Sequence, residues 1–297
     1  MNNVKTIFSI KDLENLSGVK AHTIRIWEKR YNILMPMRTD TNIRYYDLNN
    51  LQKLLNITLL HKHGYKISKI ATFDEDKIPM LVKQIISDKS VRHHAVNAFK
   101  MAMMNFDQSL FFATYDNLLS EKSFNEVFYE VFIPLLNDIG VLWQTDTIMP
   151  AHEHFISYLI RQKILTNTEK IQTVAPSNND KVFVLFLPVG EIHELGLLYV
   201  NYEIVRHGYK SIYLGESLPV ENLKDLRRHF DNIVFVSYFT IQPNANEGES
   251  YVNRLVNEVL DENSECWLLG RNTEKMMLPD NDKLCLYQSI SELVADL

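Results

Sequence analysis

Glu191-Ile192-His193-Glu194-Leu195-Gly196 is the stretch that decides the fold and chemistry of the carboxyl-terminal part of this 297-residue chain. It directly follows the apolar run 181–187, which has the length and composition of a buried strand. Open α/β sheets bind ligands at the carboxyl ends of their strands. His193 stands at such an end and can ligate a metal there, while Glu191 can accept the proton of its other ring nitrogen.

The residues around this stretch predict a doubly wound, Rossmann-like parallel sheet. Strand-like runs alternate with helical segments, and such alternation is typical of five parallel strands joined by helical crossovers. The predicted strands are 182–187, 211–214, 233–236, 266–269 and 283–287.

Upstream of the sheet, apolar residues recur with helical period from about residue 78 to residue 171, which predicts a bundle of four or five helices. The segment 173–180, which contains Pro176, is the clearest linker. Short helices, a tight turn and a β-hairpin wing are expected before residue 73. The chain is therefore predicted to be a multidomain α and α/β protein with domains at 1–75, 76–172 and 181–297.

Charge is distributed unevenly along the chain. Residues 1–72 carry 12 Lys and Arg against 5 Asp and Glu, and because the whole chain carries 31 against 37, the remainder carries 19 against 32. Such asymmetry suggests that the first part binds a polyanion. No apolar run has the roughly 18 residues of a membrane span. Cys266 and Cys285 do not form a disulfide framework, so a cytoplasmic location is expected.

The first segment resembles the winged helix-turn-helix of the MerR family over residues 6–73. The resemblance rests on Phe8-Ser9-Ile10, Leu16-Ser17-Gly18-Val19, His22 to Glu28, Pro36, Arg38, Arg44-Tyr45-Tyr46 and Gly64. It implies that helix 21–30 enters the major groove of double-stranded operator DNA. The residues expected to contact bases or phosphates are Lys20, His22, Thr23, Arg25, Arg38, Arg44 and Tyr45. A charge cluster more commonly only solvates an exposed face, but here it coincides with the turn of a helix-turn-helix.

The stretch 191–196 resembles the Asp/Glu-x-His-x-x-Gly signature of cobalamin-binding domains, in which the histidine is the lower ligand to cobalt. The resemblance makes His193 the metal ligand, lets the nucleotide tail of the cofactor pass beside Gly196, and places Ser237 and Gly270 along that tail. Two positions depart from the pattern. Phe239 replaces a leucine, and Arg271 replaces a second glycine, where a side chain can crowd the tail.

Trp143 is separated by nine residues from Glu153-His154. This spacing resembles the light-responsive, adenosylcobalamin-binding branch of MerR regulators, which repress carotenoid synthesis. The resemblance implies that Trp143 covers the adenosyl group and that Glu153 and His154 line its pocket. Gln144 stands where those sensors carry a second histidine. His152 and His154 lie two residues apart, unlike the four-residue spacing of helical zinc sites, so no zinc site is predicted.

A single histidine after a strand usually does not ligate a metal, and a tryptophan in a helical bundle usually belongs to the core. Here both occur in the order expected for a cofactor site, which supports cofactor binding. We therefore expect a non-enzymatic transcriptional regulator that binds cobalamin, in its adenosyl form, and acts as a dimer or tetramer on DNA. Two alternatives remain open. One is a MerR-type regulator that has lost cobalamin and responds to a protein partner or another ligand, as Arg271 and Gln144 would favour. The other is a corrinoid methyltransferase subunit, which would have no use for residues 6–73.

Overall fold

The computed structural model describes residues 7–74, 76–86, 91–276 and 278–297. The chain forms two compact units, Met1–Leu159 and Ile160–Leu297, and their boundary falls inside the long helix α10 (Pro150–Gln172). The division into three domains stays a prediction. Among the described residues no helix is both long and apolar enough to cross a membrane.

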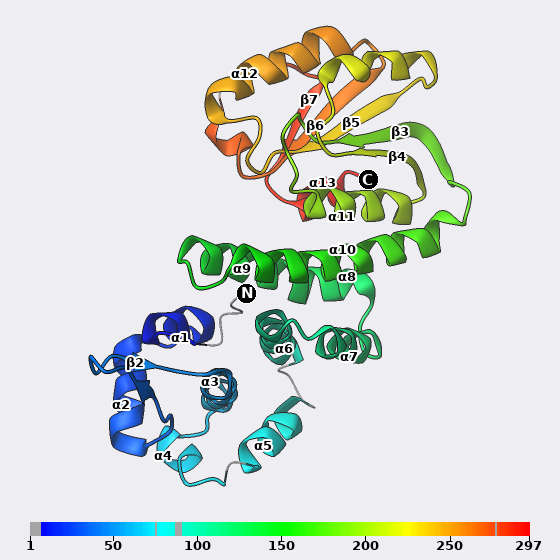
Figure 1. The fold of residues 1–297 in the computed structure, drawn as a ribbon. Helices are drawn as coiled ribbons and strands as arrows, with labels where there is room; N and C mark the ends of the chain where they lie inside the picture. Colours follow the sequence, from blue (N-terminus) through cyan, green and yellow to red (C-terminus); the bar gives the residue numbers. More distant parts are fainter. Residues whose placement is uncertain (1–6, 75, 87–90, 277) are drawn as a thin grey trace. The chain divides into compact units, whose positions relative to one another are not determined.

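The first unit begins with a helix-turn-helix and a short wing (Figure 1). Ser9 starts the first helix, because its hydroxyl accepts the Asp12 N–H at 3.1 Å and the Asp12 carboxylate accepts the Ser9 N–H at 2.7 Å. Gly18 ends that helix with φ 74°, a conformation that glycine adopts at little cost. The elements are α1 (Ile10–Ser17), α2 (Ala21–Tyr31), β1 (Met37–Arg38), β2 (Arg44–Tyr45), α3 (Leu48–Lys62) and α4 (Ile67–Ile70).

The remainder of the first unit is helical, as the apolar period predicts. Phe99, Phe111 and Phe132 form the centre of its core, with ring centroids 4.9 Å apart for Phe99–Phe111 and 5.6 Å for Phe99–Phe132. A π-helical turn stands directly before Pro134, which has no N–H to donate to the carbonyl four residues earlier. The elements are α5 (Lys77–Ile86), α6 (Val91–Asn105), α7 (Gln108–Leu119), α8 (Phe124–Val127), η1 (Phe128–Phe132), α9 (Ile133–Gln144) and the start of α10.

The second unit contains the predicted parallel sheet of five strands, in the order β4-β3-β5-β6-β7. Helices α11 and α13 cover one face and α12 covers the other (Figure 1). The strands are β3 (Asn178–Phe186), β4 (Tyr209–Gly215), β5 (Ile233–Tyr238), β6 (Ser264–Leu269) and β7 (Leu284–Tyr287); the helices are α11 (Leu195–Arg206), α12 (Ala245–Arg254), continued by η4 (Leu255–Val259), and α13 (Ile290–Ala295).

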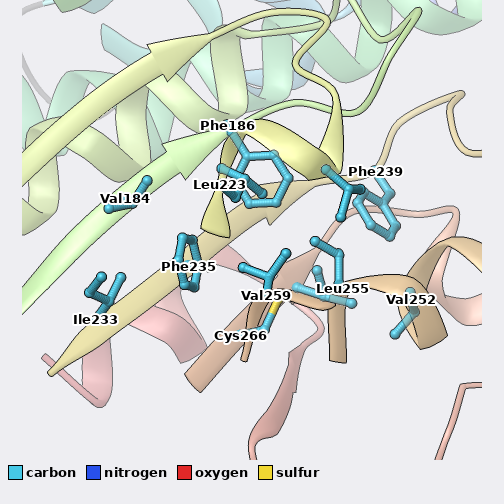
Figure 2. Packing of buried hydrophobic residues seen from close by; sticks show 12 residues of the cluster. Val184, Phe186, Leu223, Ile233, Phe235, Phe239, Val252, Leu255, Val259 and Cys266 are labelled. Atoms are coloured by element: carbon cyan, nitrogen blue, oxygen red, sulfur yellow. The ribbon is translucent and has the colours of Figure 1, made fainter. Parts of the chain in front are cut away.

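A cluster of fully buried apolar side chains joins the sheet to α12. Figure 2 shows Phe235 of β5 beside Val259, and Phe239, just after β5, on the side of Leu255 and Val252. Burying side chains of this size contributes roughly 1.5–3 kcal/mol each. The cluster fixes the carboxyl end of β5, where the candidate site begins.

Two expectations need correction. The segment 173–180 is not all linker, because β3 already begins at Asn178, whose N–H donates to the Gly208 carbonyl at 2.9 Å. Two crossovers contain 3₁₀ turns among the described residues instead of α-helices: η2 (Val220–Asn222) and η3 (Lys224–Arg228) follow β4, and η5 (Thr273–Lys275) follows β6. Pro219 stands directly before η2 with φ −65°, which suits the start of a helical turn.

Candidate functional site

The candidate ligand site lies in the loop after β3. In the sheet β3 stands between β4 and β5, so the chain runs from β3 to one side to form β4 and then crosses to the other side of β3 to form β5. Open α/β sheets bind ligands at such a switch point. The loop carries Glu191 and His193 and leads directly into α11.

Glu191 is a fully buried carboxylate that joins two loops. Its Oε1 accepts the backbone N–H groups of Ile192 at 2.9 Å and His193 at 3.0 Å. Its Oε2 accepts backbone N–H groups of the loop after β5, at 3.2 Å from Thr240, 2.7 Å from Ile241 and 2.8 Å from Gln242. Burial alone would raise the pKa of Glu191, but hydrogen bonds from the His193 ring and these backbone groups outweigh it and hold the pKa at about 2. Glu191 is therefore ionised at neutral pH.

This carboxylate orients the His193 imidazole. Nδ1 of His193 lies 2.6 Å from Oε1 of Glu191. An ionised carboxylate can only accept, so Nδ1 carries a proton, and in the neutral imidazole Nε2 then presents a lone pair. The His193 side chain is 45% exposed although Glu191 is fully buried. A neutral imidazole held in this way is the form in which histidine ligates metals.

Large apolar side chains lie at the surface of the two loops that Glu191 joins. Val189, Ile192 and Ile241 are each more than half exposed. Exposed apolar side chains that gather on one surface mark binding sites. A corrinoid supplies its own equatorial ligands to cobalt and needs one axial imidazole, so these loops fit the face of a corrinoid.

The surroundings of Gly196 fit the rest of a cobalamin less well. A Cβ built on Gly196 would lie 2.7 Å from Cε2 and 2.8 Å from Cζ of Tyr238, so the tyrosine ring lies directly against the glycine. Ser237 is fully buried, and its hydroxyl donates to the Phe186 carbonyl at 2.9 Å. At Gly270, which has φ 106°, a Cβ would lie 2.2 Å from the Phe239 carbonyl oxygen. The nucleotide tail expected beside Gly196 therefore meets a space that Tyr238 fills.

Three residues near this site have no role in the sequence analysis. Glu194 is buried, and burial raises its pKa against the opposing effects of the Tyr213 hydroxyl and Arg161. Nε of Arg161 lies 2.5 Å from Oε1 of Glu194, and the Tyr213 hydroxyl donates to Oε2 at 3.0 Å. These contacts hold the start of α11. No sequence signal links the three, because they come from α10, β4 and the loop before α11.

The three predicted cap residues flank a short turn of the first unit. Trp143 lies in the last turn of α9 and is 55% exposed, although an indole in a bundle is usually core. Glu153 lies in the first turn of α10, where Oε1 accepts the Ser157 hydroxyl at 2.9 Å and Oε2 lies 3.5 Å from Nδ1 of the exposed His154. The side chain of Gln144 lies outside the described residues.

The residues expected to contact bases stand at the start of α2. His22 and Arg25 are exposed, and Thr23 is half-buried. Nζ of Lys20 lies 3.2 Å from Oε1 of Glu14, so this lysine has a partner within the protein. The expected base-contacting side chains thus share one turn of helix.

Glu14, to which the sequence analysis gives no role, fixes the angle between the two helices of the motif. Its carboxylate accepts the backbone N–H of Ala21 at 3.0 Å, at the first residue of α2. This bond, followed by those from Lys11 and Lys20, lowers the pKa of Glu14 to about 2. An anionic acceptor at a helix amino terminus is stabilising.

On the wing, Arg38 is exposed, and its Nη1 donates to Asn42 Oδ1 at 2.6 Å. Nε of Arg44 lies 3.3 Å from Oε2 of Glu28, whose other oxygen accepts the hydroxyl of the fully buried Tyr46. Tyr45 is half-buried on β2. Of the two adjacent tyrosines, Tyr45 is the one whose hydroxyl can reach a phosphate.

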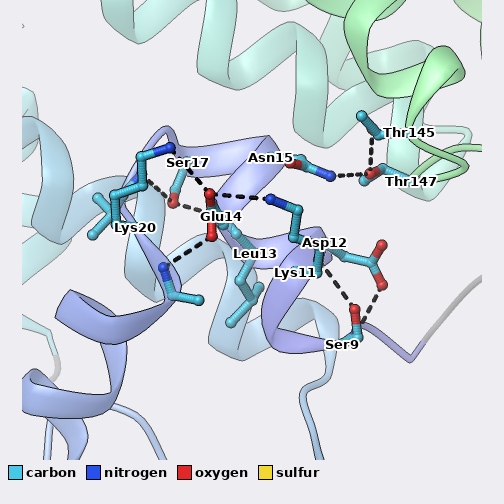
Figure 3. Close-up of polar contacts among 12 residues, drawn as sticks. Ser9, Lys11, Asp12, Leu13, Glu14, Asn15, Ser17, Lys20, Thr145 and Thr147 are labelled. Atoms are coloured by element: carbon cyan, nitrogen blue, oxygen red, sulfur yellow. Dashed lines mark hydrogen bonds and ion pairs between the residues drawn. The ribbon is translucent and has the colours of Figure 1, made fainter.

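The helix-turn-helix is bonded directly to the turn between Trp143 and Glu153 (Figure 3). Nδ2 of Asn15 in α1 donates to Oγ1 of Thr147 at 2.9 Å, and Thr147 lies 2.9 Å from the Thr145 hydroxyl. Nearby, buried Lys100 of α6 lies 2.7 Å from Asp138 of α9 and donates to the Leu16 carbonyl at 3.4 Å. Two separate sets of polar contacts therefore connect the DNA-reading motif with α9, which carries Trp143, and with the turn after it.

Comparison with known proteins gives two family matches. Residues 8–77 match the MerR HTH family of regulatory proteins, and residues 95–165 match the B12 binding domain. The chain thus carries a MerR-type helix-turn-helix followed by a B12 binding domain. The second match covers the helices that carry Trp143 and Glu153 and supports cobalamin as the cofactor.

Two curated relatives come from Myxococcus xanthus. The chain is 28% identical over 226 residues to the HTH-type transcriptional repressor CarH, and the alignment covers 73% of each protein. It is 22% identical over 217 residues to the HTH-type transcriptional repressor CarA, with 72% of this chain and 70% of that protein covered. A solved structure, the monomethylamine corrinoid protein of Methanosarcina barkeri, aligns over 69% of this chain and 97% of its own, with TM-score 0.53 and 12% identity. This last likeness shows the fold alone.

Proposed function

We propose that this chain, which joins a MerR-type helix-turn-helix to a B12 binding domain, is a transcriptional repressor whose operator affinity changes when adenosylcobalamin binds. The names of the two Myxococcus relatives support repression. One winged module buries too little surface for tight specific binding, so two or more copies would bind a two-fold symmetric operator.

The observation that carries the proposal is the bonded connection between α1 and the 145–147 turn. Because Asn15 donates to Thr147, a displacement of this turn is transmitted to the first helix of the DNA-binding motif. Lys100 adds a second connection, through Asp138 and the Leu16 carbonyl. A bound ligand that moves Trp143 would therefore change the position of α2 relative to DNA. A switch requires such a local change in packing that acts at a distant site.

Each of the candidate site residues would have a distinct role in binding the cofactor. His193, held by Glu191, would ligate cobalt through Nε2, and Trp143 would cover the upper group, with Glu153 and His154 beside it. Adenosylcobalamin, when bound, supplies a cobalt–carbon bond that light breaks. Loss of the adenosyl group would remove the surface against which Trp143 packs. Trp143 is 55% exposed, so its indole is available to pack against that group.

The test measures DNA affinity and the cofactor spectrum on the full chain. A duplex selected from a randomised library serves as the operator, and its affinity is measured without cofactor, with adenosylcobalamin in the dark, and after illumination. We expect these states to differ by roughly 5–150-fold. His193→Ala should abolish the difference and shift the corrinoid spectrum toward the base-off form.

Asn15→Ala separates sensing from DNA reading. It should leave the corrinoid spectrum intact and reduce the change in operator affinity, whereas Asn117→Ala, at an exposed position on α7, should change neither. An unaltered affinity change in Asn15→Ala would rule out this connection as the route. If DNA binds and no corrinoid does, the alternative of a regulator with another ligand gains support, and Tyr238 is the observation that favours it.

A further inference from the structure

The ring of Tyr238 occupies the place beside Gly196 that a corrinoid's lower nucleotide would need. Three ring atoms, Cε2, Cζ and Cδ2, lie 2.7, 2.8 and 3.0 Å from the position of a Cβ at residue 196. Gly196 is the second residue of α11, and Tyr238 is the last residue of β5, so the ring fills the gap between that helix and the sheet edge.

This position is stable for the tyrosine. Burial raises the pKa of the Tyr238 hydroxyl, and the charge of Arg271 lowers it in part. Arg271 itself is exposed. Tyr238 is half-buried, which suits a side chain with an apolar ring and a polar hydroxyl.

The nucleotide of cobalamin hangs from the same face of the ring as the axial ligand that His193 would supply. It must therefore enter the sheet edge on the side of His193. Gly196 has no side chain and leaves space there, but the Tyr238 ring fills that space. We propose that Tyr238 is a specificity-determining residue, which makes this site favour a corrinoid without a lower nucleotide, such as cobinamide, over cobalamin. The inference rests on the proposed function, because it presupposes that His193 ligates a corrinoid.

The expected magnitude follows from the population of the open state. If the tyrosine leaves its place in 1–10% of molecules, within the usual range for minor conformers, the affinity for cobalamin falls by roughly 10–100-fold. Cobinamide needs no such opening. His193 must also displace cobalamin's own base from cobalt, and this second contribution does not depend on residue 238. The informative quantity is therefore the change in the affinity ratio when Tyr238 is replaced.

The experiment titrates the full chain with adenosylcobinamide and adenosylcobalamin, following the visible spectrum and the heat of binding. Tyr238→Ala should improve cobalamin affinity by roughly 10–100-fold and leave cobinamide affinity within about threefold. Retained cobinamide binding shows that the variant is folded. Tyr251→Ala, which removes a mostly buried tyrosine on the α12 side of the sheet, should leave the ratio unchanged.

The outcomes separate this inference from the proposed function. An affinity ratio that is the same in the wild type and in Tyr238→Ala overturns the role of Tyr238 and leaves the corrinoid-binding proposal intact. If wild type binds neither corrinoid, the proposed preference for cobinamide is overturned, even where Tyr238→Ala binds cobalamin, and the wild-type chain is no cobalamin sensor. If no variant binds either corrinoid through His193, both are overturned.

Discussion

Replacing Glu191 by glutamine should destabilise the second unit and, in one of the two orientations of the new amide, also reverse the tautomer of His193. The carboxylate accepts backbone N–H groups at both oxygens and the His193 ring at one of them. A glutamine amide has one accepting oxygen and one NH₂ group. Whether the NH₂ group takes the place of Oε1 or of Oε2, it faces backbone N–H donors. When the NH₂ faces His193, Nδ1 must accept, so Nε2 carries the proton and cannot ligate a metal.

The structure gives two estimates of the cost. The fall in the pKa of Glu191 from 4.5 to about 2 corresponds to about 3 kcal/mol between the ionised and neutral forms. Counting instead two backbone N–H groups left without an acceptor, at roughly 1–3 kcal/mol each, gives about 2–6 kcal/mol. A loss of about 3 kcal/mol lowers the melting temperature of a unit of this size by roughly 6–12 °C.

Scanning calorimetry of the full chain at pH 7 would measure this, with Glu262→Gln at an exposed position as the matched control. Because the pKa of Glu191 is lowered in the folded state, its contribution is complete above pH 4.5 and is lost as the pH falls toward 2. The gap between wild type and variant should therefore narrow over that range. A Glu191→Gln variant that melts within 2 °C of wild type at pH 7 would refute the reasoning.

Further predictions concern each part of the molecule. Arg38→Ala should weaken binding to all duplexes and reduce the log–log salt slope by about 0.9 for one lost phosphate contact, so an unchanged slope in a salt titration would contradict its role. Arg25→Ala should instead change the ranking of duplexes in a selection experiment, at about 1–3 kcal/mol per base contact. Ser9→Ala should cost about 0.5–2 kcal/mol in denaturant unfolding, because it removes the hydroxyl that accepts the Asp12 N–H at the start of α1. Trp143→Ala should reduce the preference for adenosylcobalamin over methylcobalamin in spectroscopic titrations, since only the larger upper group can pack under an indole; equal loss for both would argue against that contact.

The strands and helices were predictable because each is encoded locally. The run 233–236 is apolar throughout, as expected for a strand covered on both faces, and β5 spans it. Ser9 and Gly18 mark the ends of α1 through their own chemistry. The Glu-x-His spacing likewise places Glu191 beside His193, since both lie in one short loop.

The remaining polar contacts join residues that the sequence does not bring together. Asn15 and Thr147 are far apart along the chain, and no pattern in either segment indicates the bond between them. Glu28 could be assigned to α2, but its pairing with Arg44 and Tyr46 depends on how the wing folds back. A single sequence contains no signal for such pairs, because their energy appears only after the elements have packed.

The contact between Tyr238 and Gly196 joins distant parts of the sequence, but strand geometry is sufficient to predict it. Arg271 lies in the loop after β6, where its side chain is exposed. Side chains of a strand alternate between faces, and Phe235 and Phe239 belong to the cluster on the α12 side. Tyr238 must then face the opposite side, where α11 begins with Leu195-Gly196. The right-handed crossover from β3 to β4 puts α11 on that face, so strand period and crossover handedness together predict that Tyr238, and not Arg271, meets Gly196.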